Sequence, residues 1–203
     1  MNRMVLCLAL AVSLTVSALA PLSHAAKSPI GQGSRIVAGA ISFDSKGGAF
    51  YEDEDGKRES EWKLYPSGGY FIRDRIAVSL VLEVAIIRQG EFLDQIWAVG
   101  PGAEYYFGGG RQSGGTYYFV GGAYLFGQYI HDSGIPEERR EHYNLQNLKL
   151  DTGMTYMLSD AVGATIALFY DLTWVKQNEP DKGDSWVNGN NVGFEFGFTT
   201  FLF

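Results

Sequence analysis

Charged side chains recur inside stretches of this sequence that are otherwise apolar. They share an alternating face with small residues, and they are Lys63, Glu83, Glu104, Lys149, Asp151, Asp171 and Glu195. Charges that are removed from water must pair, hydrate or be neutralised. Such a set could line a cation pathway, carry out acid–base chemistry with paired carboxylates, or form a polar network that fills a closed interior. The sequence indicates no substrate cleft, so the acid–base interpretation is the weakest of the three.

A histidine and a serine lie two residues apart in His131-Asp132-Ser133, which is a second candidate for chemistry. A nucleophile, its base and an orienting group must lie within hydrogen-bonding reach of one another. The sequence identifies no acidic partner for His131, so we expect an exposed loop histidine and no catalytic residue. We also expect His142 on the surface, because two histidines without a third ligand make a poor metal site. The acidic run 52–55 lacks the ligand spacing of a calcium loop, and neither a metal nor a cofactor is predicted.

The elements that position these residues are strands. Alternation is clearest in residues 148–175, where two segments of period two are joined by a very short turn. One parity is apolar, with Leu150 and Leu168, whereas the other carries Lys149 and Asp171. A period of two indicates strands with one apolar and one polar face. Each segment is long enough to cross a bilayer, which takes about ten tilted residues, and an apolar outside around a polar interior is typical of a membrane barrel.

The turn between these segments sets their register. A three-residue turn at 159–161 keeps both apolar stripes on one face, whereas a two-residue turn puts them on opposite faces. The three-residue turn places Lys149 directly opposite Asp171. We predict an ion pair between these two residues that helps to close the lumen. Similar reasoning at the tight turn 73–75 opposes Tyr65 to Glu83.

Eight strands are predicted, and they favour an all-β, eight-stranded antiparallel up-and-down transmembrane barrel. The predicted ranges are 34–45, 59–72, 76–88, 95–107, 116–130, 148–158, 162–175 and 186–203. Pro66 is expected to cause a bulge or distortion, since proline cannot donate to a ladder. Both faces of 116–130 are apolar, so its orientation is left open. The interior of an eight-stranded barrel is just wide enough for side chains to fill it, which favours a filled, non-conducting lumen over a pore.

The N-terminus has the features of an export signal. Arg3 supplies a positive start, residues 4–20 are apolar, and Ser23-His24-Ala25 offers a cleavage site. We expect residues 1–25 to be a cleaved signal peptide, 26–33 a short periplasmic leader and 34–203 the barrel domain. Cleavage removes Cys7, the single cysteine, so no disulfide or thiolate site is predicted. The formal net charge of −7 argues against nucleic acid as a partner.

Four stretches resemble the small eight-stranded outer-membrane β-barrel domain family. They are YPSGGYFIRDRIA (65–77), WAVGPGAEYYF (97–107), GMTYMLSDAV (153–162) and VGFEFGFTTFLF (192–203). The resemblance implies an outer-membrane location, surroundings of lipid and lipopolysaccharide, and a monomer. It also implies that the outer-membrane assembly machinery reads the C-terminal strand through Phe201 and Phe203. Phe194, Phe196 and Phe198 lie on the other parity, and a bulge near 199–200 would reconcile the two sets.

The predicted function is a structural or envelope role for an integral outer-membrane barrel. Four aromatic residues fall near the strand ends that face the longer loops, where interfacial anchoring explains them; they are Trp62, Trp97, Trp174 and Trp186. The main alternative is a periplasmic lipocalin-like barrel that binds a small hydrophobic ligand, which needs Lys149 and Asp171 on the outside. A further alternative is a lipid A-modifying enzyme, because the spacing of His131 and Ser133 is faintly similar to that of lipid A deacylases.

Overall fold

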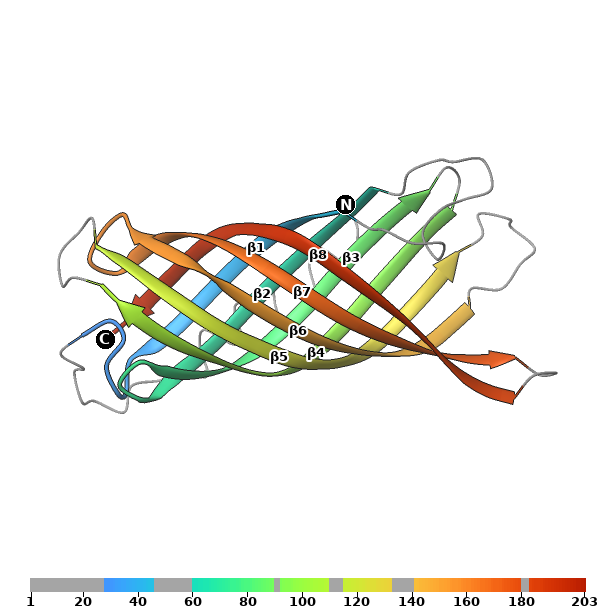
Figure 1. Cartoon of the computed structure of the whole chain (residues 1–203), viewed down its shortest axis with the longest axis horizontal. Helices are drawn as coiled ribbons and strands as arrows, with labels where there is room; N and C mark the ends of the chain where they lie inside the picture. The colour runs from blue at the N-terminus through green and yellow to red at the C-terminus, as the bar shows by residue number, and fades with distance from the viewer. Residues whose placement is uncertain (1–27, 46–59, 90–91, 110–114, 133–140, 180–182) are drawn as a thin grey trace, which may run out of the picture.

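Eight strands pair in sequence order, and β1 pairs with β8 to close an antiparallel barrel (Figure 1). The strands are β1 (Arg35–Ser45), β2 (Ser60–Arg73), β3 (Ile76–Gln89), β4 (Phe92–Gly108), β5 (Thr116–Asp132), β6 (Glu141–Met157), β7 (Val162–Glu179) and β8 (Gly183–Leu202). This computed structural model describes residues 28–45, 60–89, 92–109, 115–132, 141–179 and 183–203. The predicted signal peptide, the acidic run 52–55 and Ser133 lie outside the described residues. The eight-stranded barrel predicted from the sequence is confirmed.

The two ends of the barrel differ in their connections. Strands β2, β4 and β6 finish, and β3, β5 and β7 begin, at the end of the barrel that also holds the described start of the chain and the C-terminus; this is called the turn end (Figure 1). The opposite end, where β1, β3, β5 and β7 finish, is called the loop end. At the loop end β6 begins at Glu141 and β7 runs to Glu179, beyond the predicted limits. Backbone pairing continues there although both faces carry polar residues, so the alternation that marks a strand in the sequence is lost.

The register of the central hairpin is as predicted. Residues 159–161 form the turn between β6 and β7, where the backbone N–H of Leu158 donates to the carbonyl of Val162 at 2.8 Å. Lys149 is consequently the cross-strand neighbour of Asp171. A three-residue loop therefore keeps the two apolar stripes on the same face of the sheet.

The β2–β3 hairpin also keeps its predicted register, but its irregularity lies elsewhere. The pairs Leu64↔Val84 and Ser67↔Val81 share one register, so β2 has no bulge at Pro66, although the pairing with β3 is interrupted between Leu64 and Ser67. The shift in register lies between Phe71 and Arg73. Arg75, at the turn, has a φ of 70°. A residue in this conformation beside a bulge is the usual way to close a three-residue hairpin, which explains why the shift is at the turn and not at the proline.

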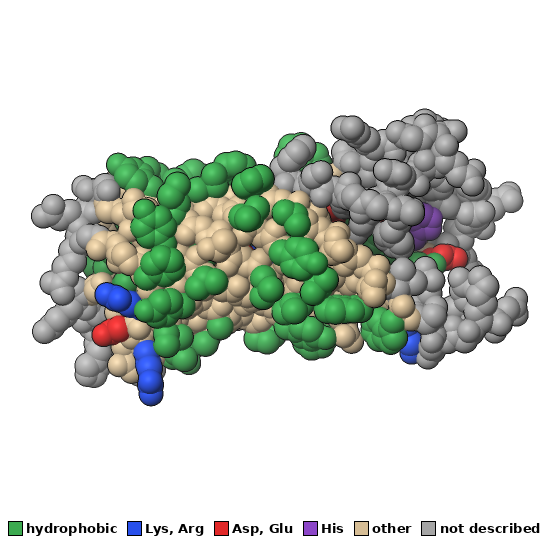
Figure 2. Space-filling model, in the orientation of Figure 1, with side chains coloured by type: hydrophobic (Ala, Val, Ile, Leu, Met, Phe, Trp, Pro, Cys, Tyr) green, Lys and Arg blue, Asp and Glu red, His purple; other side chains and the backbone are tan. Residues whose placement is uncertain are grey.

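The apolar residues of the strands face outwards. Leu80 is 56% exposed and Phe198 is 63% exposed, whereas Lys149 is 3% exposed and Glu83 is 2% exposed. On the face shown in Figure 2, apolar side chains form a band around the barrel, and charged side chains appear toward its ends. This distribution is the inverse of the one that a soluble lipocalin-like barrel requires. The described residues contain no helix of the length and apolarity needed to cross a membrane.

Strand β5, whose orientation the sequence left open, turns one apolar face inwards and another outwards. Tyr117, Phe119 and Leu125 are buried inside the barrel, and Val120 and Phe126 are half exposed on the outside. The inward residues belong to two apolar clusters that fill the two ends of the interior. The sequence of β5 is apolar on both alternating faces because its inward residues pack in both clusters and its outward residues form part of the lipid-facing surface.

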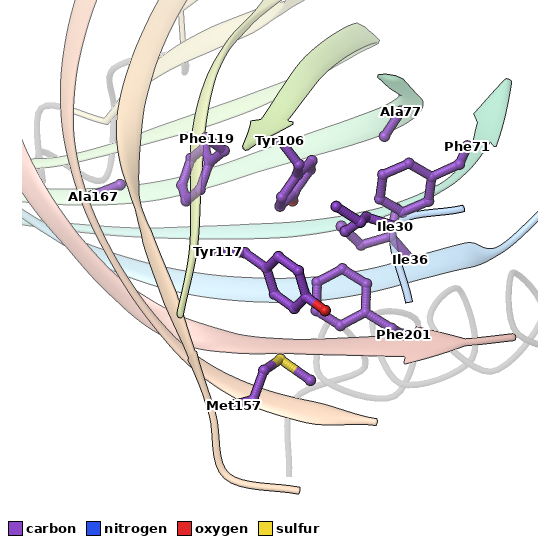
Figure 3. Packing of buried hydrophobic residues seen from close by; sticks show 10 residues of the cluster. All are labelled: Ile30, Ile36, Phe71, Ala77, Tyr106, Tyr117, Phe119, Met157, Ala167 and Phe201. Atoms are coloured by element: carbon purple, nitrogen blue, oxygen red, sulfur yellow. The ribbon is translucent and has the colours of Figure 1, made fainter. Parts of the chain in front are cut away.

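The apolar cluster near the turn end contains five aromatic rings that are linked to one another by ring contacts (Figure 3). Its members are Ile30, Ile36, Phe71, Ala77, Tyr106, Tyr117, Phe119, Met157, Ala167 and Phe201. The cluster near the loop end consists of Tyr65, Val81, Ala85, Ile87, Ile96, Ala98, Ala123, Leu125 and Leu145. These two sets are called the turn-end cluster and the loop-end cluster. Buried polar residues lie between the two clusters and among the members of the loop-end cluster, and they are called the polar layer.

Residues 28–34 close the turn end and are called the N-terminal plug. Ile30 is buried in the turn-end cluster, and its carbonyl accepts a hydrogen bond from the backbone N–H of Arg75 at 2.8 Å. The backbone N–H of Gln32 donates to the carboxylate of Asp74 at 2.8 Å. The backbone N–H of Gly33 donates to the carbonyl of Phe71 at 2.9 Å. The plug is thus bound to the β2–β3 hairpin and presents one apolar side chain to the interior.

Candidate functional site: the polar interior

The polar residues nearer the loop end form an interlinked group around Tyr65. The hydroxyl of Tyr65 lies 3.4 Å from Glu83 Oε1 and 3.4 Å from Asp171 Oδ2. Asn147 donates from Nδ2 to Glu83 Oε2 at 3.0 Å. Lys63 Nζ lies 3.5 Å from Asp171 Oδ2 and 3.6 Å from Glu61 Oε2. One phenol, one amide and one ammonium therefore hold three buried carboxylates.

Two members of this group were not identified from the sequence. Glu61 and Asn147 are buried inside the barrel although neither was among the expected lumen residues. Glu61 lies two residues before Lys63, so the same alternation that placed Lys63 inside would have found it. Asn147 lies just before residue 148, where the alternation of β6 becomes clear. The sequence pattern therefore did not indicate that its side chain is buried.

The second ammonium in the interior belongs to Lys149. Its Nζ lies 2.5 Å from Glu195 Oε2 in β8, 3.4 Å from the centre of the Tyr65 ring and 4.8 Å from the centre of the Phe169 ring. An ammonium over an aromatic face is stabilised by the ring quadrupole, and more strongly when it is desolvated. Lys149 is therefore held by one carboxylate and two aromatic faces.

The ion pair predicted between Lys149 and Asp171 is wrong, although their register is right. The Lys149 ammonium pairs with Glu195, and the Asp171 carboxylate pairs with Lys63. The register fixes which α-carbons are neighbours, but a lysine side chain is long enough to cross the narrow lumen. The Lys63–Asp171 pair connects β2 with β7, and the Lys149–Glu195 pair connects β6 with β8. Each ion pair thus links two strands that are not adjacent in the sheet.

Glu104 and Asp151 approach each other across β5, on either side of Gly121. Both residues are cross-strand neighbours of this glycine. A Cβ placed on Gly121 would lie 2.8 Å from Glu104 Cγ and 2.9 Å from Asp151 Oδ1, so only glycine leaves room for both side chains. Glu104 accepts a hydrogen bond from the Tyr106 hydroxyl at 2.5 Å. Asp151 Oδ1 is shielded from solvent and has no hydrogen-bond partner among the described residues.

A cavity of about 60 Å³ lies in this polar layer. Its lining includes the carboxylates of Glu104, Asp151 and Glu195, the ammonium of Lys149 and the hydroxyl of Ser79. Tyr106 and Phe119 of the turn-end cluster and Tyr65, Val81 and Ala123 of the loop-end cluster also line it. The expected lumen residues thus form two groups: Lys63, Glu83 and Asp171 near the loop end, and Glu104, Lys149, Asp151 and Glu195 around the cavity.

The candidate histidine lies at the loop end, with an acidic partner that the sequence did not identify. His131 Nδ1 is 2.6 Å from Asp94 Oδ1 in the neighbouring strand β4, and the hydroxyl of Tyr129 donates to the same carboxylate. His131 has the inward parity of β5, so it faces the mouth of the barrel and not the lipid-facing side. Ser133 lies outside the described residues. His142 is exposed, and the described part of the chain holds no group of three acidic, histidine or cysteine side chains placed to bind a metal ion.

Comparison with known proteins gives a match in structure only. No family model and no curated protein matches this sequence. The crystal structure of Neisserial surface protein A aligns with 84% of this chain and 97% of its own, at 15% identity and a TM-score of 0.51. That of the outer membrane protein OprG from Pseudomonas aeruginosa aligns with 87% of this chain and 99% of its own, at 14% identity and a TM-score of 0.54. This chain has the fold of a small outer-membrane β-barrel. The predicted outer-membrane location agrees with that fold and with the apolar outer face.

The outer-membrane barrel fold places the tryptophans on the lipid-facing side. Trp62 and Trp186 are exposed there, and Trp97 and Trp174 are partly buried. All four lie in the half of their strands nearer the loop end. This position suits the aromatic belt that amphipathic rings form at a membrane interface.

The C-terminal strand differs from the expected geometry. β8 keeps one register with β1 and with β7 through Thr199 and Thr200, so the bulge considered there is absent. Phe201 consequently points into the barrel and is fully buried in the turn-end cluster, whereas Phe203 is half exposed at the chain end (Figure 3). The three phenylalanines at 194, 196 and 198 face outwards.

Proposed function

We propose that this protein is an integral outer-membrane barrel with a structural role in the cell envelope and a lumen that does not conduct ions. The observation that carries the proposal is the apolar packing near both ends of the interior. The turn-end cluster with its N-terminal plug lies near one end, and the loop-end cluster with its ion-paired polar residues lies nearer the other, so that the cavity of about 60 Å³ is enclosed between them. An eight-stranded barrel has little space beyond that which its own side chains occupy.

In this proposal the turn end faces the periplasm and the loop end faces the exterior, as is usual for barrels with short periplasmic turns. The outer band contacts lipid and lipopolysaccharide, and the four tryptophans anchor the barrel at the interface. The protein acts as a monomer and carries out no catalysis. The assembly machinery recognises the chain through the C-terminal strand, which contains Phe201, and through Phe203, which directly follows it and is the more accessible of the two.

Single-channel recording of the purified protein in planar bilayers tests the non-conducting lumen. Folded protein should add no steady conductance to that of the bare membrane. A variant with Phe71, Tyr106 and Phe201 all replaced by alanine removes three rings of the turn-end cluster and serves as the opened control. Its insertion is checked by the mobility difference between unheated and heated samples on gels. Steady conductance of the unmodified barrel, at a level similar to that of the opened control, would refute the proposal.

A further inference from the structure

The negative charge in the interior is not balanced at the cavity. Three carboxylates line it, those of Glu104, Asp151 and Glu195, but only one ammonium, that of Lys149. Lys149 is already engaged by Glu195 at 2.5 Å and by the faces of two aromatic rings. Glu104 receives a phenolic hydrogen bond from Tyr106, and Asp151 Oδ1 has no partner among the described residues. Leaving buried carboxylates uncompensated is costly, so either protons or a small cation must compensate them.

The cavity also has room for one. A water molecule needs about 10–15 Å³ of such volume, so about 60 Å³ accommodates a small ion with a few waters. A second shielded oxygen that has no hydrogen-bond partner within the described part of the chain, Ser79 Oγ, lines the same cavity. Gly121 keeps the space open between Glu104 and Asp151, because any side chain at this position would occupy it.

We infer that the cavity is a binding site for a hydrated monovalent cation of the alkali type, held by Asp151 and Glu104 with Ser79 and water as the other ligands. Divalent ions fit less well. Ca²⁺ takes six to eight oxygen ligands and Mg²⁺ demands near-ideal octahedral geometry. The described residues form no group of three acidic, histidine or cysteine side chains placed to bind a metal ion by themselves, so water must supply most of the ligands. Two carboxylates and a hydroxyl in a space of this size suit an ion that keeps part of its hydration shell.

Stability in different salts tests the site, whether or not the lumen conducts. The protein is refolded into detergent micelles in NaCl, KCl or tetramethylammonium chloride at equal ionic strength, and its thermal unfolding midpoint is measured. A ligand that binds only the folded state stabilises it with the logarithm of its concentration. The midpoint should therefore rise by about 3–5 °C for each tenfold increase in Na⁺ or K⁺ above the dissociation constant. Tetramethylammonium, which is too large for the cavity, should give no such rise.

Two variants locate the effect. Asp151→Asn removes a ligand, and Gly121→Ala fills the space between the two carboxylates without changing charge; both should abolish the difference between Na⁺ and tetramethylammonium. Glu83→Gln, a neutralisation in the polar group nearer the loop end, and Gly68→Ala, at a glycine with no close neighbour, should keep it. Equal midpoints of the unmodified protein in all three salts would overturn the inference. So would a midpoint that responds to pH alone, since protons would then supply the missing charge.

Discussion

Lys149 in β6 and Glu195 in β8 form an ion pair across the whole width of β7, with Nζ 2.5 Å from Oε2. Both side chains are buried, with 4% and 8% of their surfaces exposed. A pair of this kind connects two strands that share no backbone hydrogen bonds. It therefore resists changes in the cross-section of the barrel that the ladders alone would permit.

Removing one member of this pair should destabilise the barrel more than removing both. Lys149→Met leaves Glu195 buried without its cation, and breaking a buried pair in this way costs about 3–5 kcal/mol. Lys149→Met combined with Glu195→Gln should cost less than Lys149→Met alone. Urea unfolding of the single and double variants in lipid vesicles measures the coupling energy.

The control is a second double-mutant cycle, between Lys149 and its cross-strand neighbour Asp171. The coupling between Lys149 and Asp171→Asn should be smaller than that between Lys149 and Glu195→Gln, because Asp171 pairs with Lys63. Larger coupling to Asp171 would mean that the side chains follow the register, as the sequence alone suggested.

The contrast between register and pairing shows what could be predicted from the sequence. A turn of known length fixes which α-carbons face each other, and the parity of each residue fixes the face on which it lies. Both follow from a period of two and were predicted correctly for Lys149 and Asp171. The choice of ion-pair partner depends on side-chain reach across a curved, closed sheet, and no local pattern specifies it.

Two other features of the structure could not be predicted from the sequence, for different reasons. Residues 28–34 have no periodicity, and their role arises only from tertiary contacts of Ile30 with the turn-end cluster. The acidic partner of His131 comes from β4, about forty positions earlier in the chain. Asp94 and His131 both lie just outside the strands predicted at 95–107 and 116–130. Their pairing follows from the β4–β5 register, which the glycine-rich connection between these strands did not specify.

The outer face provides a second prediction. Leu80→Arg should destabilise the barrel by about 2–4 kcal/mol in bilayers, since Leu80 is more than half exposed on the lipid-facing side and far from the strand ends. Asp160→Arg, in the exposed β6–β7 turn, is the control and should have little effect. Urea titrations in vesicles give both values. Equal tolerance at the two positions would mean that Leu80 does not contact lipid.

The N-terminal plug provides a third prediction. Ile30→Ala should lower the free energy of unfolding by about 2–5 kcal/mol, the usual cost of truncating a buried isoleucine, because Ile30 packs within the turn-end cluster. Gln32→Ala, which alters an exposed side chain of the same segment, should change it little. Both variants are compared by urea unfolding in vesicles. Similar stabilities for the two would show that Ile30 is not packed in the cluster.

The last prediction concerns the histidine at the loop end. His131→Ala should leave the acyl chains of lipid A unchanged in cells that produce the protein, because His131 faces the mouth of the barrel and binds Asp94 within it. It should also lower stability by about 1 kcal/mol through loss of that contact. His142→Ala, at an exposed position, controls for removal of a histidine. The number of acyl chains on lipid A is measured by mass spectrometry. If the unmodified protein removes an acyl chain and His131→Ala alone abolishes the removal, the Asp94–His131 pair is catalytic and the purely structural role is wrong.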